Sequence, residues 1–222
     1  MAILSPSNGL PGLFPWVHDL GLQRIRNDFN LEPIEYPTTR RMGSSLADRA
    51  ADIMAAFADQ EIMAIITSVG GNDQIKLLRF LDAGVIKNNP KPFFGFSDNT
   101  HLHIYLSNLG IPSYYGGSVM TQYAMQGQMM DMTINSLKKA LFEGGTLTAR
   151  GSEQYNEIGL DWADQKTLAQ QRVLETNEAL SWDGNTVVEG LLWGGCVESM
   201  VAQCAAGVYL PRAEDMAGRI LF

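Results

Sequence analysis

The sequence predicts an α/β fold with a parallel β-sheet. Over residues 1–145, short apolar segments alternate with segments of helical periodicity, the rhythm of strands joined by crossover helices. Residues 62–67 form an unbroken apolar segment, as expected for a strand covered on both faces. After residues 143–145 the pattern changes to short strands and turns. We therefore expect an α/β domain over residues 1–145 and part of a smaller, β-rich and incomplete domain over residues 146–222.

The elements follow from periodicity and turn residues. In the first domain, strands are expected over 2–5, 31–36, 62–67, 93–96 and 111–115, and helices over 16–27, 46–57, 75–81, 98–108 and 120–142. The last of these helices should break near Gly127, because glycine weakens a helix interior. In the second domain, we expect strands over 146–150, 180–182 and 186–189, a hairpin turn at 183–185, a helix over 194–206 and the beginning of a strand at 219–222.

Composition excludes several classes of function. The chain has 222 residues and 45% of them are apolar, enough for a large core. Its net charge of -8 and the absence of a basic cluster argue against nucleic acid as a partner. Cys196 and Cys204 have no His or Cys at ligand spacing, so we expect reduced thiols, no disulfide, no metal and no cofactor. Without a signal sequence or a run of about 18 apolar residues, a cytoplasmic protein outside the membrane is expected.

The clearest chemical feature is an apolar segment that stops at a serine. The strand 93–96 is followed at once by Ser97-Asp98-Asn99-Thr100, which is typical of a helix start. Ser97 would then lie on the turn between a strand and a helix, with its hydroxyl above the carboxyl edge of the sheet. That is the position of a nucleophile in many α/β enzymes.

A serine nucleophile needs a base, and the sequence offers three histidines. His18 lies on the first predicted helix, where a partly exposed structural role is expected. His101 and His103 lie on the helix after Ser97, whose side chains run along its flank and do not easily reach a hydroxyl at its start. We expect capping or packing roles for both. The sequence therefore supplies a nucleophile without an evident base.

Gly70-Gly71 stands between a predicted strand and a predicted helix. Two glycines there can expose backbone N–H groups to an anion or an oxyanion, but a plain tight turn explains them equally well. The spacing of the glycines fits neither Gly-x-Gly-x-x-Gly nor a P-loop, so a nucleotide-phosphate loop is disfavoured.

Several motifs together resemble one family. They are Ser5-Pro6-Ser7, Gly70-Gly71 before Leu77-Leu78 and Leu81-Asp82, Gly95-Phe96-Ser97-Asp98-Asn99-Thr100, Tyr115-Gly116 and Leu192-Trp193-Gly194-Gly195. Their order and content resemble the LD-carboxypeptidase family of serine peptidases, and within it the branch of the microcin C self-immunity peptidases. The resemblance spans essentially the whole chain.

The resemblance implies a flavodoxin-like or Rossmann-like first domain, a smaller β-rich second domain, a homodimer, and a Ser, Glu, His triad in that chain order. Ser97 matches the family's nucleophile, and the amides of Gly71 and Asp98 match its oxyanion hole. Gly70 and Ser5 match positions near the substrate.

The other two triad members have no match in this sequence. In the family, the glutamate follows a strand of the Ile-Leu-Phe type and the histidine comes later, whereas here residues 220–222 are the last. Both are expected beyond residue 222, in which case this chain is a fragment and inactive or nearly so. Glu189 is expected to be a strand-end or hairpin residue, and Glu198 an acid in the first turn of a helix, where the dipole favours it.

Two substrate classes follow from the resemblance. One is a murein tetrapeptide of peptidoglycan recycling, which loses its terminal D-alanine. The other, which the microcin immunity branch favours, is an aminoacyl nucleotide whose amide bond is cut. Trp162 matches an aromatic residue that stacks on the nucleotide base in that branch, although a loop tryptophan packed on its own domain is the alternative. A non-catalytic α/β domain, which would hold a small anion on the loop 5–12 and the Gly70-Gly71 amides, is the contrasting hypothesis.

Overall fold

The computed structural model describes residues 1–178, 183–184 and 187–222. Its centre is a five-stranded parallel sheet in the order β2-β1-β3-β4-β5. The strands are β1 (Ala2–Leu4), β2 (Ile34–Glu35), β3 (Ile65–Thr67), β4 (Phe93–Gly95) and β5 (Tyr114–Tyr115). The α/β class is confirmed, and this strand order is that of flavodoxin-like folds. In such sheets, ligands bind outside the carboxyl ends of the strands where the order reverses, which here lies between β1 and β3.

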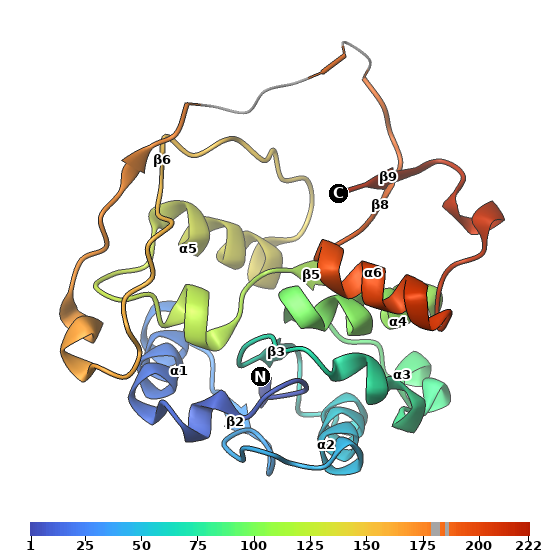
Figure 1. The fold of residues 1–222 in the computed structure, drawn as a ribbon, viewed down its shortest axis with the longest axis horizontal. Helices are drawn as coiled ribbons and strands as arrows, with labels where there is room; N and C mark the ends of the chain where they lie inside the picture. The colour runs from blue at the N-terminus through green and yellow to red at the C-terminus, as the bar shows by residue number, and fades with distance from the viewer. Residues whose placement is uncertain (179–182, 185–186) are drawn as a thin grey trace.

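Helices cover both faces of the sheet (Figure 1). They are α1 (Pro15–Phe29), α2 (Leu46–Ala58), α3 (Ala83–Asn88), α4 (Thr100–Asn108) and α5 (Asp131–Lys138), and a further helix, α6 (Val197–Ala206), packs on α4. Side chains alternate between the faces along each strand. Ile65 and Phe93 pack with α2, α3 and α4, whereas Ile66 and Phe94 pack with α1 and α5. Full burial of each such side chain stabilises the fold by about 1.5–3 kcal/mol.

Two helical predictions need correction in detail. The segment 75–81 forms two short 3₁₀ turns, Gln74–Lys76 and Leu78–Phe80, and α3 begins only afterwards. The reason is Asp82, whose Oδ1 accepts hydrogen bonds from the amides of Gly84 and Val85 and so caps a new helix. The segment 120–142 consists of a π-turn (Val119–Tyr123), α5 and a second π-turn (Lys139–Glu143). The predicted break is confirmed, because Gly127 has a φ of 73°.

Most strands after residue 145 lie at positions other than those predicted. The strand expected over 146–150 is wrong, because these exposed residues have no strand beside them to complete a ladder. The strand predicted at 180–182 lies outside the described residues, and the hairpin turn predicted at 183–185 lies partly outside them. Residues 187–189, predicted as part of a strand, are irregular. An antiparallel pair, β6 (Gln154–Tyr155) and β7 (Glu175–Thr176), was not predicted.

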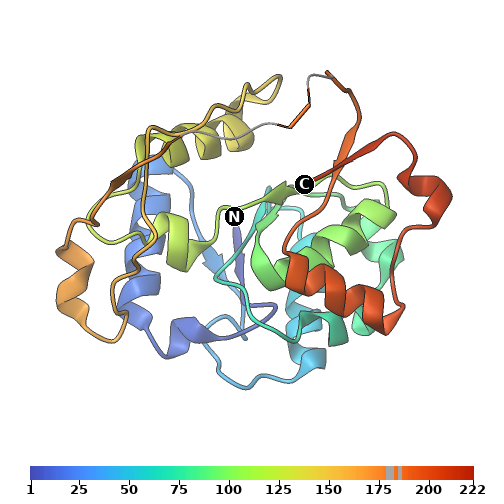
Figure 2. The same ribbon diagram turned by 45° about the horizontal axis from the view of Figure 1, so that its top comes forward.

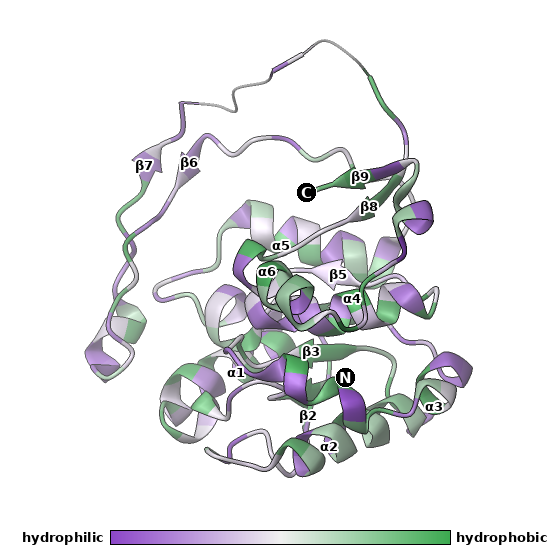
Figure 3. Cartoon of the chain, turned by 45° about the vertical axis from the view of Figure 1, so that its right-hand side comes forward, coloured by the Kyte–Doolittle hydropathy of each residue, from purple (hydrophilic) through white to green (hydrophobic). Residues whose placement is uncertain are grey.

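The last segment is closer to expectation. The helix predicted to end at residue 206 is α6, and the predicted final strand is β9 (Arg219–Leu221). β9 pairs in parallel with β8 (Leu191–Trp193), and much of the apolar surface of this pair, shown green in Figure 3, is exposed. The sequence did not predict β8 as a strand, because its pairing partner lies 28 residues further along the chain.

The two parts of the chain after residue 145 pack against the part that contains the five-stranded sheet, on different sides (Figure 2). The segment before β7 lies along α1, where the Trp16 indole N–H donates to the Trp162 carbonyl at 2.7 Å. α6 lies on α4, where His101 Nδ1 and Gln203 Oε1 are 2.8 Å apart. In the described part of the chain, no helix is long and apolar enough to cross a membrane.

Candidate active site

The serine turn lies at the carboxyl end of β4, which pairs with the central strand β3 on one side and with β5 on the other. Ser97 has a φ of 60°, in the left-handed region that a non-glycine residue adopts at a cost of about 1–2 kcal/mol. A 3₁₀ turn (Ser97–Asn99) leads directly into α4, and the Ser97 side chain remains partly exposed. A strained turn between a strand and a helix is the geometry that presents a serine hydroxyl above a sheet.

A buried amide holds this turn in place. Asn99 is fully buried, and its Nδ2 donates to Phe96 O at 3.0 Å and to Val69 O at 3.3 Å. Its Oδ1 accepts from Gln74 Nε2 at 2.8 Å. Asn99 therefore ties the serine turn to the loop that follows β3, so the two loops keep a fixed separation.

Gly70 and Gly71 lie against the serine turn and the first loop. A β-carbon on Gly70 would lie 2.9 Å from Ser97 Cβ, and one on Gly71 would lie 2.7 Å from Ser7 Cβ. Close approach thus requires glycine at both positions. Among the described residues, no protein acceptor is recorded for the N–H of Gly71 or of Asp98. This corner of the site therefore offers two unpaired backbone donors close to Ser97.

The Asp98 side chain fixes the loop after Gly71. Its Oδ2 accepts from the amides of Asp73 and Gln74, at 3.2 and 3.0 Å, and its Oδ1 lies 3.5 Å from His101 Nε2. The carboxylate is 3% exposed, so its negative charge is held by N–H dipoles and not by water. Its role in the described structure is to order the glycine loop.

Sequence reasoning missed Arg49, which joins α2 to two loops at this edge of the sheet. Its guanidinium donates to the carbonyls of Pro6 and Ser7, at 2.9 and 2.6 Å, and forms a bidentate pair with Asp73 at 2.9 Å. The hydrogen bond from Arg49 holds the pKa of Asp73 below its usual value. Arg49 was visible in the sequence as a charged residue beside Ala50 and Ile53 on the apolar side of a predicted helix.

None of the three histidines hydrogen-bonds to the Ser97 hydroxyl. Both ring nitrogens of His103 are occupied, Nε2 by Gly95 O at 2.9 Å and Nδ1 by Ser113 Oγ at 2.7 Å. Burial lowers the pKa of His103 to about 4, so this imidazole is neutral near pH 7. His101 bonds to Gln203 and faces Asp98. The expected packing roles fit these contacts.

His18 differs from expectation, because it is fully buried and not partly exposed. Its Nε2 lies 3.0 Å from Glu35 Oε1, and Arg40 binds the same carboxylate. This ion-pair group fixes α1 against the loop after β2. A sequence pattern could not reveal this burial, because the partners come from two later segments.

Among the described residues, Ser5 and Trp162, two predicted substrate-binding residues, form no direct hydrogen bond with Ser97. The Ser5 hydroxyl is buried and donates to Thr39 O at 2.7 Å, so it lies beneath the loop surface. Trp162 is half-buried and makes an edge contact with Phe14, with ring centroids 5.8 Å apart. The same apolar cluster includes Val69, the residue before Gly70. Trp162 therefore belongs to the same apolar cluster as the residue before the glycine loop, although it comes from a distant segment.

The C-terminal segment contacts the back of the serine turn. Ser199 Oγ lies 3.4 Å from the Ser97 carbonyl oxygen, and the Cys196 amide donates to Thr100 Oγ1 at 3.0 Å. Glu198 lies in the first turn of α6, as predicted, and accepts from the Cys196 thiol. Glu189 is exposed just before β8. Neither glutamate contacts Ser97.

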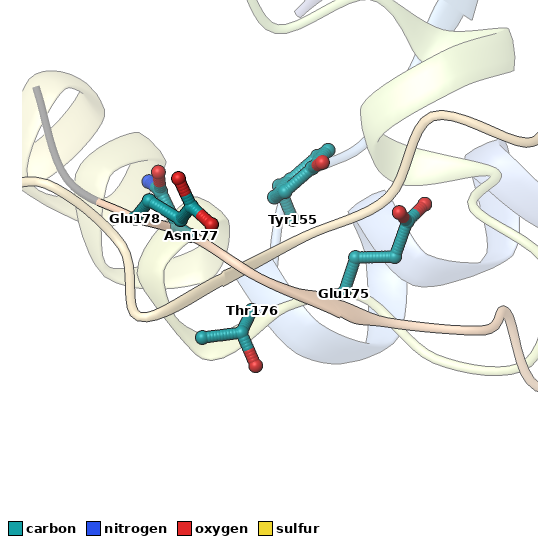
Figure 4. Close-up of a pocket in the computed structure, with 5 residues that line it drawn as sticks. All are labelled: Tyr155, Glu175, Thr176, Asn177 and Glu178. Carbon is teal, nitrogen blue, oxygen red and sulfur yellow. The ribbon is translucent and has the colours of Figure 1, made fainter.

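A separate hollow of about 680 Å³ lies against β7 (Figure 4). It is lined by Tyr155, Glu175, Thr176, Asn177 and Glu178. The Glu175 carboxylate raises the pKa of the Tyr155 phenol. Two carboxylates make the hollow acidic, and it does not include Ser97. Within the described ranges, no group of three His, Cys, Asp or Glu side chains could hold a metal ion.

The fold and the serine turn define a doubly wound α/β protein with a serine at the carboxyl end of an inner strand, β4. The family model for the LD-carboxypeptidase N-terminal domain matches residues 1–116. The chain therefore belongs to the LD-carboxypeptidase family, and the resemblance noted in the sequence is confirmed.

Relatives and solved structures agree with this assignment. The chain is 28% identical over 160 residues to the microcin C7 self-immunity protein MccF of Escherichia coli, covering 70% of this chain and 46% of MccF. It is 30% identical over 79 residues to the "Probable murein peptide carboxypeptidase" of Bacillus subtilis, covering 35% of this chain and 25% of that protein. The chain thus spans less than half the length of these curated relatives.

Two structures illustrate the likeness in fold. An MccF-like protein from Streptococcus pneumoniae, in complex with AMP, has a TM-score of 0.89 and 29% identity, and covers 99% of this chain and 70% of its own. MccF in complex with aspartyl sulfamoyl adenosine has a TM-score of 0.88 at 22% identity, and covers 100% of this chain and 66% of its own. At that identity the second likeness concerns the fold alone.

Proposed function

We propose that the protein containing these residues is a serine hydrolase that cleaves an amide bond through a Ser97 acyl-enzyme. The observation that carries this proposal is the left-handed Ser97 at the end of β4, packed against Gly70 beside two unpaired amides. Membership of the LD-carboxypeptidase family supports it.

The reaction uses these groups in order. Ser97 Oγ attacks the amide carbonyl carbon and transfers its proton to a base. The N–H groups of Gly71 and Asp98 stabilise the oxyanion of the tetrahedral intermediate, each contributing about 3 kcal/mol. The amine leaves with a proton from the conjugate acid of the base, and water then hydrolyses the ester.

The base belongs to a part of the protein outside residues 1–222 in this proposal. Each histidine present is committed to other partners, and His103 is held neutral within the core. We assign the role to a histidine oriented by a glutamate, which is the family's Ser, Glu, His arrangement. Residues 1–222 alone should then show little or no turnover.

For the substrate we favour an aminoacyl nucleotide over a murein tetrapeptide. The support is an MccF-like relative at 29% identity that binds AMP, together with an aromatic cluster of Phe14 and Trp162 beside the glycine loop. Trp162 would stack on the base, and the Gly70 backbone and the loop containing Ser5 would border the substrate. We further propose a homodimer, which light scattering on the full-length protein would test.

Substrate hydrolysis by the full-length protein tests the proposal. Ser97→Ala should abolish cleavage of an aspartyl-adenylate analogue with an amide linkage. Ser44→Ala is the matched control, because its hydroxyl bonds only to the Arg41 carbonyl at the surface. Cleavage that survives Ser97→Ala would contradict the proposal. Binding of the analogue without cleavage in any variant would instead favour the non-catalytic anion-binding domain.

A further inference from the structure

We infer that Tyr115 is a positioning residue for Ser97, a role that rests on the proposed function. The Ser97 N–H donates to the Tyr115 hydroxyl oxygen at 3.1 Å. This contact comes from the sheet itself, because β4 and β5 pair in parallel with Gly95 opposite Tyr115. The register therefore places the phenol directly over the first residues of the serine turn.

The contact satisfies an amide that the turn leaves without a partner in regular structure. Ser97 precedes α4 and has left-handed backbone geometry, so its N–H is not part of a helix or a ladder. An acceptor that holds the N–H fixes the backbone from which the Ser97 side chain projects, so the hydroxyl can occupy only the positions that the χ1 rotamers allow. Among the described residues, the Gly71 and Asp98 amides lack acceptors, whereas the Ser97 amide has one. The Ser97 amide therefore holds the turn through Tyr115, whereas the Gly71 and Asp98 amides remain available for the oxyanion of the proposed reaction.

Tyr115 is itself held between two rings. Its ring centroid lies 5.6 Å from that of His103 and 5.8 Å from that of Phe222. Hydrogen bonds with Gly95 O and Ser113 Oγ fix the position of the His103 ring, so the ring restricts the movement of Tyr115. Phe222 follows β9, so the C-terminal pair of strands supports the phenol from the other side. Through Tyr115, the packing of residue 222 is coupled to the position of Ser97.

Tyr115→Phe in the full-length protein removes only the hydroxyl and keeps both ring contacts. We expect the covalent labelling of Ser97 by a fluorophosphonate to slow about 10-fold, as for loss of one hydrogen bond that positions the nucleophile. Tyr114→Phe is the matched control, because Tyr114 is equally exposed at 41% and stacks on Phe94. No hydrogen bond of its hydroxyl is recorded within the described residues. The Tyr114→Phe variant should therefore be labelled at the wild-type rate.

A double-mutant cycle tests the coupling to Phe222. Phe222→Ala should slow labelling in the Tyr115 background by about 3-fold, and should have no further effect once Tyr115 is Phe. Labelling of Tyr115→Phe at the wild-type rate, or equal slowing in Tyr114→Phe, would overturn the role of Tyr115 while leaving Ser97 as the nucleophile. Additive effects in the cycle would overturn the coupling. If wild-type protein does not label at all, the proposed function fails and this inference fails with it.

Discussion

A β-carbon on Gly70 would lie 3.0 Å from the Oγ of Ser97. The loop after β3 and the turn after β4 are therefore in direct contact at the reacting atom. The Asn99 side chain holds the two loops at this separation through hydrogen bonds with Thr67, Val69 and Gln74. The contact makes Gly70 a sensitive position, because neither loop can move aside without breaking buried hydrogen bonds.

Gly70→Ala should reduce the rate of Ser97 labelling by about 100-fold in the full-length protein. The added methyl group displaces the serine hydroxyl, and displacements near 1 Å cost about this much in rate. Gly151→Ala is the control, since a β-carbon there meets no atom within 4 Å. A Gly70→Ala protein that folds and labels as fast as Gly151→Ala would disprove the close contact.

Trp162→Ala should raise KM for an adenylate substrate by about 10-fold or more, because stacking on a base contributes about 1–3 kcal/mol. KM for a muropeptide should change little. Trp16→Phe should act in the same direction but more weakly, because it removes the indole N–H that holds the Trp162 carbonyl but leaves the Trp162 ring in place. Equal increases in KM for both substrates would argue that Trp162 acts only by packing.

His103 should make stability fall with acid. Its folded pKa of about 4 lies below the ordinary value of 6.5, so the unfolded chain binds more protons between these pH values. Stability therefore rises with pH through this window and is fully present above 6.5. Urea unfolding from pH 7 to pH 4 should show a loss of about 2–3 kcal/mol that His103→Gln lacks. Identical slopes for the two proteins would contradict the burial of a neutral imidazole.

Glu35 should affect the pH dependence of stability at more acidic pH than His103. Burial pushes its pKa up, but hydrogen bonds from His18 and Arg40 outweigh this and lower the pKa to about 2. A carboxylate whose pKa is lowered on folding contributes its full stability at pH values above its ordinary pKa of 4.5. That stability is lost as the pH falls toward the folded pKa of about 2. Glu35→Gln should cost about 1 kcal/mol at pH 7, after allowance for solvent screening, and nothing near pH 2.

Glu32→Gln is the control for that measurement. Glu32 is 70% exposed and pairs with Arg26 at 3.3 Å at the surface, where ion pairs contribute little. The pH profile of Glu32→Gln should follow wild type throughout. A Glu35→Gln profile parallel to that of Glu32→Gln would show that His18 and Arg40 do not stabilise the charge of Glu35.

Sequence reasoning predicted the local features and missed those that depend on distant pairing. The continuous apolar strand 62–67 and the serine after residue 96 were recognisable, because burial on both faces and a strand-to-helix turn leave short-range patterns. The parallel pairing of β8 with β9 leaves no such pattern. The contact of Tyr115 with Ser97 likewise depends on the register of β4 and β5. The expected strand at 146–150 failed because strand propensity without a partner does not make a ladder.

The most direct test of the central claim is the site of covalent modification. Full-length protein is incubated with a fluorophosphonate, digested and mapped by mass spectrometry. We predict a single adduct on the peptide that contains Ser97, absent after Ser97→Ala and formed far more slowly by residues 1–222 alone. An adduct that persists in Ser97→Ala, or no adduct on wild-type protein that binds the adenylate analogue, would contradict the assignment of Ser97 as the nucleophile.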